Sequence, residues 1–323
     1  MQTPSIRLLL ATIALLCTAC SGPSQVRDRV ELINAPLDQD VAEILAFRAL
    51  DDRSQLTDID DRVRNAFDDD EERAHKEEQM VLVLRAAEAS LDARRFACRQ
   101  LAMIGTDRCV PDLAVIVIHI DDLQAMALHA LESIDTDLAH RALIEALPHT
   151  QSTHRIGIVN ALGRSRANKS VAALKALMND SDTLTALAAT SALGNIGTRA
   201  AAMVLTRANA TSTAHSKDSV AHALLLCANR LLADGRDTAA LAVFAELQAD
   251  DQPTKIRMAA IRGRLQAAPT ERARVVQALM EDGDAEIRAL GAQLDARSDG
   301  TGDNGTDGND TGKTNVVPAT ASE

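Results

Sequence analysis

Residues 182–197 read DTLTALAATSALGNIG and contain the phrase that decides the fold of this chain. In that phrase a small apolar residue, Ala189, lies one helical turn before a leucine, Leu193. The phrase recurs with leucines at Leu101, Leu131, Leu162, Leu193, Leu231, Leu265 and Leu294, preceded four positions earlier by Ala97, Ala127, Ile158, Ala189, Cys227, Ile261 and Leu290. Successive leucines are 30, 31, 31, 38, 34 and 29 residues apart. Self-similarity at such a period is the signature of a repeat protein.

Each copy of the phrase falls in the second helix of a predicted helix pair. These second helices are predicted at residues 91–105, 122–135, 153–166, 182–197, 219–235, 254–268 and 285–297, each after a first helix with apolar residues at helical spacing. Three glycines, Gly105, Gly197 and Gly235, follow second helices at the position that favours a left-handed backbone. The long step to Leu231 indicates an insert at residues 206–219. The sequence therefore predicts an all-α solenoid of about seven helix pairs.

The copy at residues 284–294, DAEIRALGAQL, carries a more specific pattern. A turn aspartate, Asp284, precedes an Ile-Arg pair at Arg288 and the leucine Leu294, and residues 91–95 (LDARR) and 255–260 (KIRMAA) are similar. This pattern resembles HEAT and HEAT-like repeats over about residues 75–297. The resemblance implies an extended protein-binding surface, with the second helices on the concave side of the solenoid.

The N-terminus, MQTPSIRLLLATIALLCTAC, has the pattern of a secretory signal. Its end resembles a bacterial lipobox, although Cys17 stands where leucine is usual. That resemblance implies cleavage before Cys20, a thioether from the Cys20 thiol to diacylglycerol, and, with Ser21 next, sorting to the outer membrane. The alternatives are an ordinary cleaved signal peptide and a cytoplasmic chain with an apolar start.

Five segments are expected along the chain. They are a lipoprotein signal peptide at 1–19, a tether at 20–40, an N-terminal helical segment at 41–74, the solenoid of HEAT-like repeats at 75–297 and an Asp/Gly/Thr-rich tail at 298–323. The tail has no apolar periodicity, so it cannot offset its ordering entropy, and it is predicted to be disordered.

Composition narrows the functional classes. The formal net charge is −12, which argues against binding the phosphate backbone of nucleic acid. Aromatic residues make up only 1%, too few for stacking on bases or sugars. The eight histidines are scattered and no Walker loop, GxSxG or GxGxxG motif occurs, so no cofactor, metal or catalytic residue is predicted.

Five arginines recur near the starts of the second helices: Arg94, Arg95, Arg155, Arg257 and Arg288. One interpretation makes them a row on the concave side that binds an acidic partner. The other follows from the family resemblance, in which the arginine pairs with a turn aspartate and neighbouring carbonyl groups and holds one repeat against the next.

Three cysteines follow the predicted lipid site, Cys20. Cys98 and Cys109 flank the turn at Gly105 and are candidates for a disulfide, the alternative being two unpaired thiols. Cys227 occupies a repeat position filled elsewhere by alanine, so it is expected in the core. No CxxC motif indicates a zinc or redox site.

Together these observations predict a non-catalytic, membrane-anchored scaffold of the bacterial envelope. It would bind a protein partner from the periplasmic face of the outer membrane, attached by its lipid, with no nucleic acid and no small-molecule substrate. Two alternatives remain: a structural envelope spacer without a specific ligand, and an accessory or lyase-like enzyme built from HEAT-like repeats.

Overall fold

The computed structural model describes residues 38–48, 53–211 and 214–299 of the chain. Within these ranges the regular structure is helical and there is no strand. The predicted signal peptide with Cys20, most of the tether and nearly all of the C-terminal tail lie outside the described residues.

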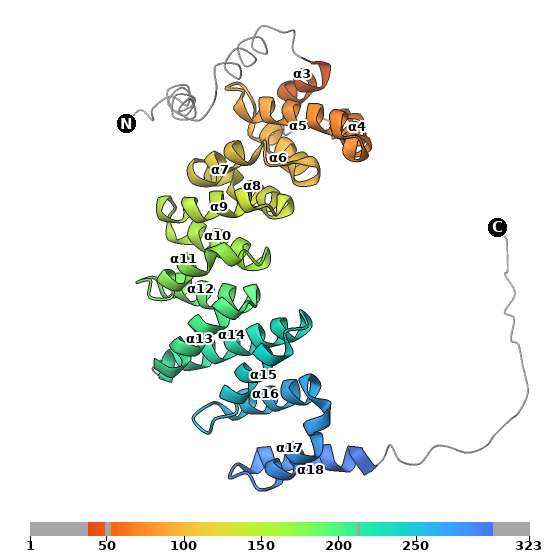
Figure 1. Ribbon diagram of the computed structural model, residues 1–323. Coiled ribbons are helices and arrows are strands. Elements are labelled where there is room, and N and C mark those ends of the chain that lie inside the picture. Colours follow the sequence, from red (N-terminus) through yellow and green to blue (C-terminus); the bar gives the residue numbers. More distant parts are fainter. Residues whose placement is uncertain (1–37, 49–52, 212–213, 300–323) are drawn as a thin grey trace, which may run out of the picture.

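Seven helix pairs follow one another in a single stack, with α3 (Gln39–Ala46) and α4 (Thr57–Asn65) at its start (Figure 1). The pairs are α5 (Asp70–Arg85) with α6 (Leu91–Ile104), α7 (Val110–His119) with α8 (Asp121–Ile134), α9 (Asp137–Ala146) with α10 (Ser152–Arg164), α11 (Val171–Leu177) with α12 (Thr183–Ile196), α13 (Arg199–Thr211) with α14 (Ala214–Ala233), α15 (Asp237–Glu246) with α16 (Thr254–Ala267), and α17 (Arg272–Met280) with α18 (Ala285–Asp299). The predicted all-α solenoid is confirmed.

Segment boundaries differ from the predicted ones by a few residues. The first pair begins at Asp70 rather than at 75, and α18 continues to Asp299, beyond 297. The expected insert at 206–219 lengthens the two helices of its pair, because α13 extends to Thr211 and α14 has 20 residues from Ala214.

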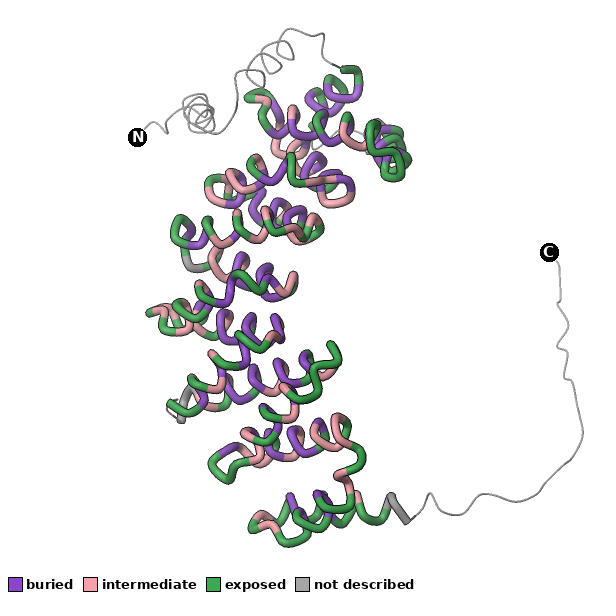
Figure 2. The backbone as a smooth tube through the Cα atoms, in the orientation of Figure 1, coloured by how far each residue is buried: buried purple, intermediate pink, exposed green. Residues whose placement is uncertain are grey.

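The repeating leucines form the core in the first five pairs and leave it in the last two. Leu101, Leu131, Leu162, Leu193 and Leu231 are at most 1% exposed, and buried residues run through every pair (Figure 2). By contrast Leu265 and Leu294 are only partly buried beside a separate small cluster. In α16 the buried face is formed instead by Ala260 and Gly263, the latter against the ring of Phe244.

Small residues let the second helices approach one another closely. A Cβ added to Gly163 of α10 would lie 2.9 Å from Cα of Ala192 in α12, and one added to Gly194 of α12 would lie 2.7 Å from the carbonyl oxygen of Ala223 in α14. The matching first helices α11 and α13 pack against each other far less extensively. A stack that is tighter on one side curves toward that side, so the second helices line its concave face.

Two of the three predicted glycine caps are confirmed. Gly197 and Gly235 have φ of 61° and 70°, in the left-handed region that favours glycine. The prediction for Gly105 is wrong, because its φ is −62°. Close approach explains this glycine instead: an added Cβ would lie 2.4 Å from the carbonyl oxygen of Leu101 and 2.9 Å from Sγ of Cys109.

Candidate functional site

Two of the five predicted arginines hold neighbouring repeats together. Arg155 donates from Nε to the carbonyl oxygen of Leu147 (3.2 Å), from Nη2 to that of Thr150 (2.9 Å) and from Nη1 to Asp180 (3.1 Å). Asp180 lies in the turn before the second helix of the next pair. The guanidinium therefore joins the end of one first helix to the following repeat.

Arg257 repeats this arrangement three pairs later. Its side chain is only 8% exposed. It donates from Nε to the carbonyl oxygen of Gln248 (3.3 Å) and from Nη2 to Asp282 (2.8 Å), which again belongs to the next turn. Asp250 and Asp284 lie 3.0 and 3.8 Å away. These are the contacts that the family resemblance implies.

The other three arginines differ from this pattern. Arg94 donates from Nη2 to the carbonyl oxygen of Ala86 (2.8 Å), and burial lowers its pKa. Arg95 pairs with Asp92 of its own helix at 3.3 Å. Arg288, exposed at the end of the stack, donates to two carbonyl groups of its own turn. The structure therefore does not gather the five guanidinium groups on one binding surface.

Sequence reasoning missed the arginine that spans the most repeats. Arg166 follows α10 with a φ of 51°, unusual for a residue with a side chain. It donates from Nε to the carbonyl oxygen of Ile196 (3.2 Å), at the end of α12, and pairs with Asp234, after α14. That pairing raises the pKa of Arg166 and lowers the pKa of Asp234. No short motif marks it, because its partner is distant in sequence.

All three described cysteines are free, buried thiols, so the Cys98–Cys109 disulfide is not formed here. Burial raises the pKa values of Cys98 and Cys227 to about 12, and that of Cys109 above its usual range.

A buried carboxylate, that of Glu77, holds the turn that contains Cys109. Glu77, 2% exposed, accepts hydrogen bonds from the backbone N–H of Thr106 (2.8 Å) and of Cys109 (3.2 Å).

A second buried carboxylate lies where the N-terminal helices cover the stack. Asp40 of α3 is 6% exposed and accepts from Arg62 of α4 (2.6 Å) and from Lys76 of α5 (2.7 Å). Burial alone would raise the pKa of Asp40, but the hydrogen bonds and charges of Arg62 and Lys76 outweigh it, and the pKa is lowered. This group fastens the N-terminal helices to the first pair.

Exposed large apolar side chains mark one part of the concave face. Leu184 and Leu187 of α12 are 65% and 43% exposed, one helical turn apart. Nearby, between α8 and α10, lies a hollow of about 280 Å³ lined by Ala125, Leu128, His129, Glu132, Gly157, Asn160 and Arg164. The other exposed large apolar residues among those described are Phe67, Met203 and Met280.

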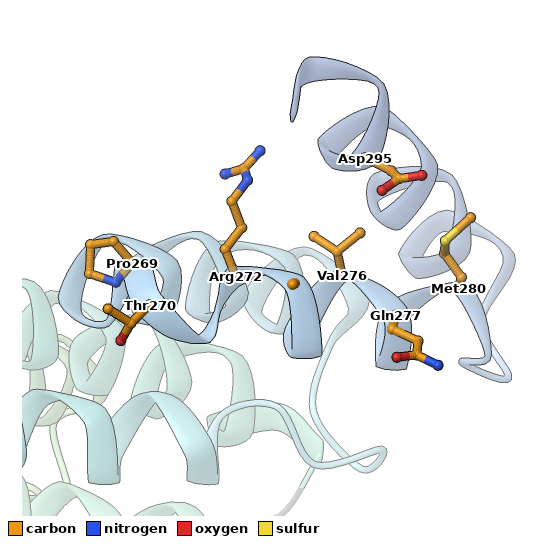
Figure 3. Close-up of a pocket in the computed structure, with 8 residues that line it drawn as sticks. Pro269, Thr270, Arg272, Val276, Gln277, Met280 and Asp295 are labelled. Atoms are coloured by element: carbon orange, nitrogen blue, oxygen red, sulfur yellow. The ribbon is translucent and has the colours of Figure 1, made fainter. Parts of the chain in front are cut away.

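A larger hollow, of about 530 Å³, lies at the last pair. Figure 3 shows Arg272, Val276 and Met280 of α17 and Asp295 of α18 around it. Arg272 donates from Nη2 to the carbonyl oxygen of Leu294 (2.8 Å), so its guanidinium ties the two helices together. This hollow lies at the end of the described stack, where no further helix pair among the described residues covers α17 and α18.

Over the described ranges, no three side chains of His, Cys, Asp or Glu come together as metal ligands would. None of the helices there combines the length and apolar character needed to cross a membrane. The predicted lipid site, Cys20, is outside these ranges.

Residues 140–225 match the family model of HEAT repeats. Over these residues the chain is similar to HEAT repeats. These residues are the part of the stack from α9 to α14, which includes the closely packed second helices α10, α12 and α14. The match supports the resemblance to HEAT repeats over residues 140–225, and no curated protein matches the chain.

Several solved structures are similar to this chain at low identity. The complex of CpcE and CpcF of phycocyanin lyase from Nostoc is 18% identical, with 81% of this chain and 96% of that chain covered and a TM-score of 0.34. An engineered protein is 18% identical over 80% of this chain and 78% of its own, with a TM-score of 0.36. Human deoxyhypusine hydroxylase is 15% identical over 75% and 96%, with a TM-score of 0.29.

Proposed function

We propose that this chain is a non-catalytic scaffold of HEAT-like repeats that binds a protein partner in the bacterial envelope. A lipid on Cys20 would anchor it, on the periplasmic face of the outer membrane. The observation that carries the binding role is the exposure of Leu184 and Leu187 on the concave face.

Exposed apolar side chains that lie together favour a binding surface over a solvated one. Leu184 and Leu187 are adjacent on one helix turn of a face that also contains the hollow between α8 and α10. The interlocking arginines support the same role indirectly, because Arg155 and Arg257 stiffen the stack that presents this face. A rigid, extended surface lowers the entropy lost on binding.

Site-specific photo-crosslinking in cells tests the proposal. A crosslinking amino acid at Leu187 should capture one recurrent protein, whereas the same amino acid at Met203 should not. Met203 is a matched control, since it is an exposed apolar residue (67%) on the first helix α13. No recurrent capture at either position would favour a structural spacer, and substrate turnover by the purified chain would overturn the non-catalytic assignment.

The anchor is tested separately. Two or three acyl chains, at about 0.8 kcal/mol per buried methylene, hold a protein firmly on a membrane. Cys20→Ser should abolish labelling by a radioactive fatty acid and move the protein from the membrane to the soluble fraction. Unchanged labelling and fractionation would refute the lipoprotein part of the proposal alone.

A further inference from the structure

Four polar residues stand at the same repeat position on the concave face. His129, Asn160, Ser191 and Asn229 each lie two residues before the repeating leucine of α8, α10, α12 and α14. All four are exposed. We call them the polar row.

A second row runs beside the first, one helical turn earlier in each helix. It consists of Ala125, Ile156, Leu187 and Leu225, all apolar and all at least partly exposed. We call these four the apolar row. Residues four apart on a helix lie on one face. The stack therefore presents a polar strip alongside an apolar strip across four repeats.

The polar row has unused hydrogen-bonding capacity. Over the described residues, no side chain of the polar row makes a hydrogen bond within the protein. Two members, His129 and Asn160, line the 280 Å³ hollow between α8 and α10. Gly157 contributes to this hollow by lacking a side chain, since an added Cβ would lie 3.1 Å from Cδ1 of Leu128.

Arginines stand at both ends of the polar row. Arg99 occupies the equivalent position of α6, two residues before Leu101. Arg155 and Arg257 each pair with an aspartate 25 residues later, so α16 can be aligned with α10 on these arginines, and Arg262 then stands at the repeat position equivalent to Asn160. Both end arginines are exposed.

The carboxylates on this face are mostly paired. Asp92 pairs with Arg95 of the same helix, and Glu132 pairs with Arg164 across the hollow. Asp122, at the start of α8, is exposed. Arg99 lies over the ring of Phe96 of its own helix (5.8 Å) and stays exposed, and Arg262 is exposed as well, so both guanidinium groups can pair with carboxylates of a ligand.

We propose that the concave face binds an extended peptide segment of a protein partner, apolar in its middle and acidic near both ends. Asparagine, histidine and serine side chains would bond to the peptide backbone, the apolar row would receive about every third side chain, and Arg99 and Arg262 would pair with the acidic ends. Such recognition takes affinity from main-chain groups and specificity from side-chain contacts. This inference rests on the proposed function and names the class of partner.

The length of the segment follows from the spacing of the helices. Packed helices lie about 8–10 Å apart, so the five steps from α6 to α16 span about 40–50 Å. An extended chain advances about 3.3 Å per residue, which gives a segment of about 12–15 residues.

A random displayed library of peptides of about 15 residues, selected on the full chain, provides the probe. The tightest binder is synthesised with a fluorescent label and its Kd is measured by polarisation. Asn160→Ala and Leu187→Asp should each weaken binding at least about tenfold, and Met203→Asp should change it less than about twofold. All three residues are exposed, so circular dichroism should show an unchanged fold.

Two further measurements test the extended, backbone-bound form. Methylation of a central peptide nitrogen should weaken binding to the wild-type chain. It should not weaken binding to Asn160→Ala any further, because the methylation and the substitution remove the same hydrogen bond. Selection on the double variant Arg99→Glu and Arg262→Glu should no longer enrich acidic ends.

The inference is overturned if the bound peptide is helical by isotope-edited infrared spectroscopy, or if binders ignore Asn160→Ala and Leu187→Asp. It is also overturned if no peptide is selected while crosslinking at Leu187 still captures one protein, a result that leaves the proposed function standing. Absence of both peptide binding and crosslinked partner would refute the two together.

Discussion

Replacing Arg257 by alanine should loosen the last helix pair from the rest of the stack. The guanidinium is 8% exposed and connects α15, through the carbonyl oxygen of Gln248, to Asp282 in the turn before α18. The last pair has few other contacts that hold it: its buried apolar cluster is small and separate from the main core, and Thr254 of α16 donates to Asp284 (2.7 Å). Loss of the guanidinium also leaves Asp282, only 21% exposed, without its cationic partner, and its carboxylate then keeps only the hydrogen bond from the backbone N–H of Asp284 (2.9 Å).

The magnitude follows from these contacts. Breaking a buried ion pair by removing one partner costs about 3–5 kcal/mol. Asp282 retains some contact with water, so the lower end applies, about 3 kcal/mol. The exposed Asp250 adds little, because surface ion pairs contribute about 0–1 kcal/mol. Each 1.4 kcal/mol is a factor of ten, so the opening equilibrium of α17 and α18 should rise about 100-fold.

Native-state hydrogen exchange read by mass spectrometry measures this locally, which matters because a repeat stack need not unfold as one unit. In Arg257→Ala the amides of α17 and α18 should exchange about 100-fold faster, with α6 to α12 unchanged. Arg262→Ala, an exposed arginine on the same helix, is the control and should change exchange less than about threefold. If both variants behave alike, the bridging role of Arg257 is refuted.

Three further predictions concern other parts of the stack. Gly163→Val should destabilise the chain by about 1–3 kcal/mol in urea unfolding, because the Cβ of the new side chain would lie 2.9 Å from Ala192. Gly283→Ala is the control and should not destabilise the chain, since Gly283 has open space around it. Equal effects would contradict the close approach at Gly163. The stability that Asp40 contributes is present above its unfolded pKa of about 3.9 and is lost as pH falls through its lowered folded pKa. The difference in unfolding free energy between wild type and Asp40→Asn should therefore shrink between pH 6 and pH 2. A constant difference would contradict this. Cys227, with a pKa raised to about 12, should resist iodoacetamide at pH 8 until denaturant is added, and rapid labelling of the native chain would show that it is not buried as described.

Periodicity in the sequence was sufficient to predict the architecture. The leucine phrase in residues 91–235 marks second helices whose repeating leucines are all buried, because that position meets the same packing environment in each repeat. Gly197 and Gly235 also follow from the sequence, since a left-handed residue after a helix selects for glycine. Such features depend on neighbours within one repeat, which a single sequence displays.

Contacts between repeats were decided by the tertiary structure. Arg155 and Arg94 look alike in sequence, but only Arg155 finds an aspartate in the next turn, 25 residues later. The register change that leaves Leu265 at the edge of the core likewise depends on Gly263 meeting Phe244 of another helix. The alignment of the polar row across repeats has the same origin.

The sequence by itself determined the helix pairs, their number and their order, because a periodic apolar pattern has only one way to be buried locally. The tertiary structure decided which polar side chains are consumed in joining repeats and which remain free on the concave face. The reason is physical: a hydrogen bond such as that from Arg166 to Asp234 depends on how three repeats stack. No local sequence pattern shows which residues that stacking brings within hydrogen-bonding distance.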